Sequence, residues 1–185
     1  MSGARRQQDA LQGYGMEDDV DPRAKRTRAA ILGAFTALLL SRRYDAIRVA
    51  DLIAAAGVGR STFYEHFRGK DEVLLAAAEP ILHTLASAAL RRASKVQLRA
   101  MLEHVWEQRG VARPLLDGRA GDKLQRRVAA LIVARGGAAA TLPARAVAAA
   151  QLTMLRLWAH GETPCPAAEL ASHILASARL LQDPD

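Results

Sequence analysis

The sequence predicts an all-α protein, and three observations carry that prediction. Half of the 185 residues are apolar, and alanine and leucine, which are strong helix formers, dominate them. Aromatic residues make up only 4%, and the β-branched residues that favour strands are sparse. Apolar positions also recur at the three- and four-residue spacing of a buried helix face. The length allows one compact unit or two small helical modules that share a core.

The first segment, residues 1–20, is polar and aperiodic. Such composition favours a disordered tail, which we expect here. Arg5 and Arg6 leave open a second interpretation, in which the tail is a basic arm that reaches into a minor groove.

Asp21 and Pro22 predict the start of the first helix, because Asp is a good N-cap and Pro fits the first helical position. The expected buried stripe consists of Ile31, Leu32, Phe35, Leu38 and Leu39. The first turns carry Arg23, Lys25, Arg26 and Arg28. Because cations at this end oppose the helix dipole, we expect an external anion there, such as phosphate, with Arg26 as a candidate contact.

Two short helices are predicted next, over Val49–Ala56 and from Arg60 to Phe67, joined by a tight turn at residues 57–59. Phe63 and Phe67 lie four residues apart and therefore share one face of the third helix. Two short helices around a glycine-containing turn, after a basic helix, are typical of a helix-turn-helix. The alternative is a helical hairpin within a bundle, without any role in binding.

The third helix has the residues that a major groove requires at its N-terminal end. Arg60 can donate two hydrogen bonds to guanine, Ser61 is small and polar, and Thr62 offers a methyl and a hydroxyl group. Tyr64, His66 and Lys70 are candidates for contacts with backbone phosphates, Lys70 with help from the amides that open the fourth helix. This pattern predicts binding to double-stranded DNA.

The charge distribution agrees with a polyanionic partner. Residues 22–70 carry ten Lys/Arg and three acidic residues, a local net charge of +7 that equals the net charge of the whole chain. Residues 1–21 sum to −3 and residues 71–185 to +3. A concentrated basic module suits nucleic acid first and an anionic membrane surface second. A solvated basic face is the remaining alternative.

The sequence predicts further helices over the rest of the chain. Lys70, Asp71 and Glu72 open a fourth helix, and Pro80 inside it predicts a kink near Ala76–Pro80 that we interpret as a hinge. Further helices are expected over residues 94–108, 121–135, 143–160 and 167–182, with breaks at 110–114, 136–137 and 161–166. The predicted domains are therefore 21–70 for DNA binding and a helical unit over 71–185, to which the family resemblance described below assigns effector binding and dimerisation.

Several function classes lack their signatures. A glycine-rich phosphate loop, a G-x-S-x-G elbow and a Cys-x-x-Cys pair are all missing, so we expect no enzyme, no catalytic residue and no cofactor. The histidines lack metal-ligand spacing, so we expect no metal, and a site among His83, His104 and Glu107 is a weak alternative. Cys165 reads as an exposed loop thiol, with a redox switch as the alternative.

The expected location is the cytoplasm. One cysteine allows no intramolecular disulfide, and the N-terminus lacks the apolar core of a signal peptide. The most apolar stretch, residues 29–40, is too short to span a bilayer. We therefore expect a soluble protein without membrane contact.

One run of residues resembles a known family. GVGRSTFYEHFRGKDEVL, from Gly57 onward, is similar to the signature of TetR-family regulators, in which an A-G-V turn precedes an aromatic-x-His-Phe run, a Lys and acidic residues. TRAAILGAFTALL and ADLIAAAG resemble the first two helices of that family, in the expected order and spacing. The resemblance covers residues 22–75, and beyond them only length and helical character agree.

The resemblance implies the same DNA contacts and a third helix locked by its phenylalanines onto Leu52 and Phe35. The sequence departs from the family pattern in two places. Arg48 stands where a Thr commonly caps the second helix, so this cap is weaker or Arg48 itself meets a phosphate. Gly59 replaces the usual Ser, which removes a side-chain cap but still tolerates the turn.

A single recognition helix buries too little surface for tight specific binding, so we expect a homodimer that reads a palindromic operator. The resemblance implies a four-helix interface from the last two helices of each subunit. The expected interface residues are Val147, Leu155, Trp158, Leu170, Ile174, Ser177 and Leu181. Alternatively, these faces only complete the core of one subunit.

The resemblance also implies an effector pocket behind the DNA-binding module. The candidate lining residues are Met101, His104, Val105, Leu124, Val128, Ile132, Met154 and Leu157, although apolar residues at helical spacing also suit plain core. The function predicted overall is a ligand-responsive transcriptional regulator, a repressor released from its operator by a small, mostly hydrophobic effector. A DNA-binding or membrane-surface protein without sequence preference is the rival interpretation.

Overall fold

The computed structural model describes residues 21–137 and 141–181. Within those ranges the chain forms α-helices and short 3-10 turns and no strand, so the all-α prediction is confirmed. The expected tail over residues 1–20, with Arg5 and Arg6, lies outside the described residues. Among the described helices, none is long and apolar enough to cross a bilayer.

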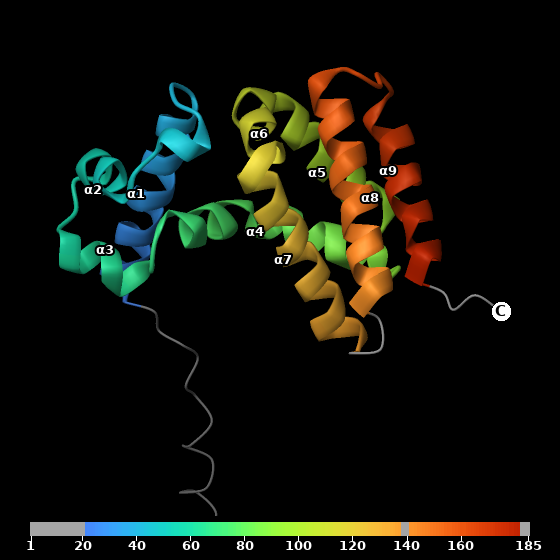
Figure 1. Ribbon diagram of the computed structural model, residues 1–185, viewed down its shortest axis with the longest axis horizontal. Helices are drawn as coiled ribbons and strands as arrows, with labels where there is room; N and C mark the ends of the chain where they lie inside the picture. The colour runs from blue at the N-terminus through green and yellow to red at the C-terminus, as the bar shows by residue number, and fades with distance from the viewer. Residues whose placement is uncertain (1–20, 138–140, 182–185) are drawn as a thin grey trace, which may run out of the picture.

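The N-terminal module contains α1 (Pro22–Leu39), the 3-10 turn η1 (Tyr44–Ala46), α2 (Val49–Ala56) and α3 (Arg60–His66). Figure 1 shows it at one end of the molecule, with α2 and α3 packed beside α1. The side chains of Ile31, Phe35, Leu52 and Phe63 are fully buried and form its core. Helix α1 begins at the predicted residue, and α2 and α3 begin and end within one residue of the positions that the sequence predicts.

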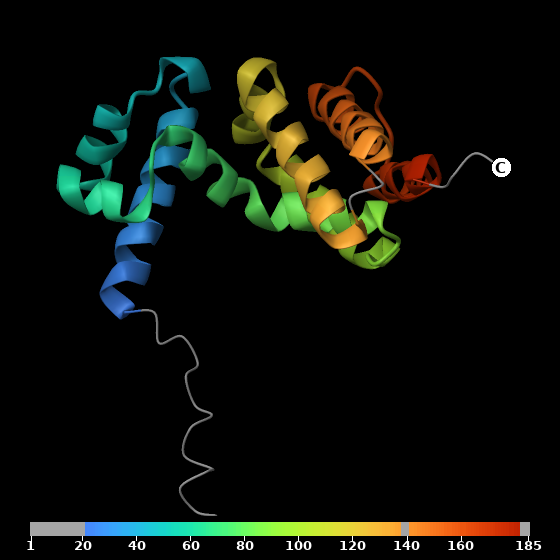
Figure 2. The same cartoon turned by 60° about the horizontal axis from the view of Figure 1, so that its bottom comes forward.

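The remaining helices form a bundle joined to the module by a long helix, α4 (Lys70–Ala89). In Figures 1 and 2, α4 runs from the module along the bundle. The bundle consists of α5 (Lys95–Glu107), α6 (Arg109–Leu116), α7 (Gly118–Gly136), α8 (Thr141–His160), α9 (Ala167–Ala176) and the 3-10 turn η3 (Ser177–Leu181). One hydrophobic cluster includes residues of the module and of the bundle, so the two parts share a core.

Two boundaries in the bundle were predicted wrongly. The expected break over residues 110–114 is the helix α6, although it contains Gly110 and Pro114. Leu116 at its end is buried, and α6 packs against α7 and α8, so packing outweighs the poor helix propensity of these residues. The last α-helix ends at Ala176 rather than continuing to residue 182, and a 3-10 turn follows.

At two positions the backbone geometry requires a glycine. Gly57 ends α2 with φ of +63°, a left-handed conformation that a side chain disfavours. A Cβ atom on Gly121 would lie 2.4 Å from the carbonyl oxygen of Leu116. The end of α6 can therefore meet α7 closely only because residue 121 has no side chain.

Candidate nucleic-acid interface

Helix α3 has one buried face and one open edge. Phe63 and Phe67 are at most 1% exposed, and their ring centroids lie 6.1 Å apart. On the other side Arg60, Ser61 and Tyr64 are exposed, while Thr62 and His66 are half-buried. The phenylalanines thus hold the helix against the module and turn its polar edge toward solvent.

Helix α1 contributes directly to this anchoring. The guanidinium of Arg28 lies 4.6 Å from the centroid of the Phe67 ring, a cation–π contact between α1 and the end of α3. From the sequence, Arg28 is only one of several basic residues in the first turns of this helix. Its half-buried side chain instead helps to fix the angle of α3.

Arg60 and Tyr64 lie one turn apart on the open edge and contact each other. The Arg60 guanidinium lies 5.9 Å from the Tyr64 ring centroid, and the Tyr64 side chain is 46% exposed. A residue and its neighbour four positions later share one helix face. The arginine is therefore directed along the outer edge, where its donors remain available.

The N-terminus of α2 is capped in an unexpected way. The Arg48 side chain has no acceptor atom, but its backbone N–H donates to Asp51 Oδ2 at 2.8 Å. Asp51 also forms an ion pair with Arg42 at 3.2 Å. The hydrogen bond from Arg48 lowers the pKa of Asp51, and Arg42 lowers it further. Asp51 thus supplies the cap, and the Arg48 side chain stays exposed.

Lys70 has an internal role in this structure, which corrects its expected place at a phosphate. Its Nζ donates to the carbonyl oxygens of Ile47 at 2.8 Å, Tyr44 at 2.9 Å and Asp45 at 3.3 Å. It also lies 4.6 Å from the centroid of the Tyr44 ring. An ammonium group has three donors, so none is left for a phosphate in this arrangement. The lysine instead ties the start of α4 to the segment before α2.

Several exposed cations of the module form no ion pair with the described residues. They are Arg23, Lys25, Arg26, Arg43, Arg48, Arg60 and Arg68. Unpaired cations on one module keep their full attraction for a polyanion such as a phosphate backbone.

Known proteins resemble this module. Residues 31–77 match the model of the bacterial regulatory proteins of the tetR family. Residues 31–77 are therefore similar to the DNA-binding module of that family. The matched residues include α2, α3 and the start of α4, so the TetR family match falls on the elements that build the open edge of α3.

Two curated TetR-type relatives come from Mycolicibacterium smegmatis. The HTH-type transcriptional repressor LfrR is 41% identical over 69 residues, which are 37% of this chain and 35% of the relative. The HTH-type transcriptional regulator EthR is 41% identical over 54 residues, 29% of this chain and 25% of the relative. The matched segment thus spans about a third or less of these relatives.

A solved structure shows that the fold extends beyond the matched segment. A TetR transcriptional regulator from Streptococcus agalactiae superposes with a TM-score of 0.57 at 23% identity. The superposition covers 84% of this chain and 95% of the other. The whole chain therefore has a TetR-like fold, with an N-terminal helix-turn-helix and a C-terminal helical domain.

The junction between the TetR-type module and the bundle contains an ionic link. Asp71, at the start of α4, accepts hydrogen bonds from the Tyr44 hydroxyl of η1 and from Lys123 of α7. Burial raises the pKa of Asp71, but these hydrogen bonds outweigh it and the pKa lies below its ordinary value. Burial and the Asp71 carboxylate raise the pKa of Tyr44. One carboxylate thus connects the module, α4 and the bundle.

This link predicts a pH-dependent loss of stability on the acid side. A carboxyl with a lowered pKa stabilises the folded state above its unfolded pKa of about 3.9, and that contribution disappears as pH falls through the folded value. Asp71→Asn should cost about 1 kcal/mol at pH 7, since the side chain is half exposed and solvent screens the pair. Urea unfolding at pH 7 and pH 3 should show the difference shrinking at pH 3. Asp122→Asn, an exposed carboxylate of α7, is the control. An equal loss at both pH values contradicts this role.

The residues expected to line an effector pocket are absent from the linings of the hollows described at other places in the structure. Val105, Leu124, Val128 and Ile132 are at most 4% exposed and pack in the core. Met101, Met154 and Leu157 are half-buried, and His104 is exposed. The larger hollows described in the structure are lined by other side chains. A ligand among the predicted residues would require the helices to separate.

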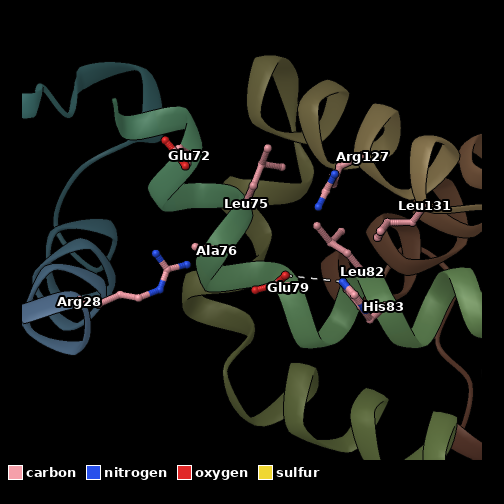
Figure 3. A pocket seen from close by; sticks show the side chains of 9 residues that line it. All are labelled: Arg28, Glu72, Leu75, Ala76, Glu79, Leu82, His83, Arg127 and Leu131. Atoms are coloured by element: carbon pink, nitrogen blue, oxygen red, sulfur yellow. Dashed lines mark ion pairs between the residues drawn. The ribbon is translucent and has the colours of Figure 1, made fainter. Parts of the chain in front are cut away.

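A hollow of about 300 Å³ lies where α1, α4 and α7 meet, and Figure 3 shows the side chains that line it. Its lining includes Arg28, Glu72 and Arg127, and an ion pair in which His83 lies 3.6 Å from Glu79. Charges of both signs are costly to cover with an apolar ligand. This junction therefore does not suit the mostly hydrophobic effector that the sequence predicts.

Gln151 of α8 is a buried polar residue that the sequence analysis missed. Its side chain is 0% exposed, and neither its Nε2 nor its Oε1 has a hydrogen-bond partner. Leaving such groups unpaired costs about 1–3 kcal/mol. Gln151 occupies an apolar position of the helical period, between Ala148 and Leu155, and this mismatch in the sequence could have identified it.

The expected dimer-interface residues lie inside the single chain. Val147, Leu155, Trp158, Leu170 and Ile174 are at most 4% exposed, Ser177 is 9% exposed, and Leu181 is half-buried. The Ser177 hydroxyl donates to the carbonyl of Ile174 at 2.6 Å. These faces of α8 and α9 are therefore packed within one chain. This is the alternative in which they complete the core of a single subunit.

In the described ranges, no three side chains of His, Cys, Asp or Glu gather as metal ligands. His83 and His104 both lie near glutamates in sequence, but His83 pairs with Glu79. The structure therefore adds no support to the metal site that the sequence analysis left open.

Proposed function

We propose that this chain is a sequence-specific transcriptional regulator that binds double-stranded DNA as a homodimer. The observation that carries the proposal is the orientation of α3, with Phe63 and Phe67 buried and Arg60 and Tyr64 exposed. Arg60, Ser61 and Thr62 contact base edges in the major groove. Tyr64, His66, Arg48 and Arg26 contact phosphates. Lys70 is not among these DNA contacts, because it ties the start of α4 to the segment before α2.

Homodimerisation follows from the size of the recognition element. Helix α3 is seven residues long, and one such helix buries too little surface for tight specific binding. Two copies related by a two-fold axis read a palindromic operator. The proposed units are residues 21–70 for DNA binding and 71–185 for dimerisation and effector binding.

The regulator acts as a repressor that a small, mostly hydrophobic effector releases from DNA. LfrR, the relative with 41% identity over 69 residues, is named a transcriptional repressor. Release requires that the effector bind more tightly to the conformer in which the two α3 helices no longer match successive grooves. The unpaired amide of Gln151 offers a polar partner to a ligand that enters the core. Helix α4, with Pro80 on its exposed side, is the element that moves.

A competition experiment tests the DNA-binding part. The protein is bound to a DNA site selected from a random pool, and excess random DNA is added at moderate salt. Specific binding should survive, because specific sites bind about 10³–10⁷-fold more tightly than random ones. If the complex disappears as fast as one formed on random DNA, the basic face binds by charge alone and the proposal fails.

A further inference from the structure

A second hollow lies where α5 meets the end of α8 and the start of α9, with a volume of about 650 Å³. In Figure 1 the loop between α8 and α9, which carries Pro164 and Pro166 at this corner, lies on the side of the bundle away from α1–α3. Its lining includes Trp106, Trp158, Glu103, Glu107, Pro164 and Pro166. None of the predicted effector residues is part of this lining, so the corner is a separate candidate site.

Two tryptophans form the aromatic wall of the hollow. Trp158 is 4% exposed, and its Nε1 donates to the carbonyl of Cys165 at 2.9 Å, which fixes the ring. The Trp106 ring lies 4.8 Å from it, centroid to centroid, and remains 38% exposed. The Arg109 guanidinium lies 4.9 Å from the Trp106 ring, so this indole already accepts a cation in the free protein.

The charged groups of the lining are both carboxylates. Glu103 and Glu107 are four residues apart on α5 and flank Trp106. Glu103 pairs with Arg99 at 2.8 Å, whereas Glu107 has no ion pair or hydrogen bond within the described residues. The hollow therefore combines an exposed indole, apolar proline edges and an unpaired negative charge.

Cys165, which also lines the hollow, does not favour a reactive site. Its thiol is half-buried, and burial raises its pKa, so the thiol is neutral at neutral pH. A neutral thiol is a weak nucleophile and behaves as an apolar surface. Reversible binding suits this corner better than reaction with an electrophile.

We propose that the corner hollow binds a hydrophobic organic cation, such as a quaternary ammonium or phosphonium compound. The positive centre takes the place of the Arg109 guanidinium over Trp106 and lies beside Glu107, and the organic groups pack on Trp158 and the prolines. Aromatic faces attract such cations, and a nearby carboxylate adds Coulomb attraction. As an effector site this rests on the proposed function, but the binding itself does not require DNA.

Tryptophan emission tests the binding directly, because both tryptophans of the chain line this hollow. Tetraphenylphosphonium is titrated into the full chain without DNA, and tetraphenylborate, of the same shape and opposite charge, serves as the matched probe. We expect saturable quenching by the cation at least 10-fold tighter than by the anion. Glu107→Gln should weaken cation binding by roughly 5- to 10-fold, and Asp122→Asn should leave it unchanged.

Three outcomes overturn the proposal. Equal binding of the two probes shows that charge is not recognised, and an unchanged affinity in Glu107→Gln places the cation elsewhere. Emission that changes with protein concentration but not with probe shows that a second copy of the chain covers the hollow. Glu107 is exposed, so its variant should fold. If the protein binds the cation but fails the DNA competition, the cation site is supported and only the proposed function is wrong.

Discussion

Phe63→Ala is expected to destabilise the protein by about 3–5 kcal/mol, the typical cost of removing a fully buried phenylalanine. Phe63 is 0% exposed and joins α3 to the core of the module. Since domains are commonly stable by about 5–15 kcal/mol, this loss removes much of the total. The cavity would also free α3 from the surface that orients its outer edge. Urea unfolding followed by circular dichroism measures the change.

The neighbouring residue provides the matched control. Tyr64 is also aromatic and lies next in the same helix, but its side chain is 46% exposed. Tyr64→Ala should change stability by less than about 1 kcal/mol, as surface substitutions usually do. If the two variants unfold at the same urea concentration, the assignment of a buried and an open face to α3 is wrong.

Arg60→Ala should have the largest effect on DNA affinity. One bidentate arginine–guanine contact contributes about 1–3 kcal/mol of discrimination. A two-fold dimer loses the contact in both half-sites, so the sum is about 2–6 kcal/mol, at least about 30-fold in affinity. Affinity for random DNA should fall much less, because it comes from phosphate contacts. Fluorescence anisotropy with a selected site and with random DNA measures both.

Arg145→Ala separates base recognition from simple loss of charge. Arg145 is an exposed arginine of α8, in the bundle rather than in the module. Its removal lowers the net charge of the protein by the same amount as Arg60→Ala. Specific affinity should therefore stay within about 3-fold of the wild type if α3 reads the DNA. A similar loss in both variants would mean that total charge controls binding.

The helix-turn-helix could be predicted closely because its signals are local. The turn at Gly57 and the phenylalanine spacing in α3 each depend on a few adjacent residues. Together they placed α2 at its observed bounds and α3 to within one residue. The exposed edge of α3 followed from the same spacing, since residues four apart share a face.

Other features depend on contacts between distant residues, which local patterns do not report. The sequence predicts Lys70 at a phosphate, but the segment before α2 folds back onto Lys70 and accepts its hydrogen bonds. Pro114 indicated a break, but packing against α7 and α8 maintains a helix there. The apolar faces of α8 and α9 had the periodicity of an interface, which is also the periodicity of a core.

Selection of DNA sites from a random pool tests most directly whether the open edge of α3 reads DNA sequence. The wild-type protein and Arg60→Ala are each taken through the same rounds, and the enriched sequences are compared. We expect the wild type to enrich two inverted half-sites, with their centres about 10 base pairs or a multiple of that apart. Arg60→Ala should lose the preference for one base pair at the same position in both half-sites. No enrichment by the wild type, or the same motif from both proteins, would contradict the account.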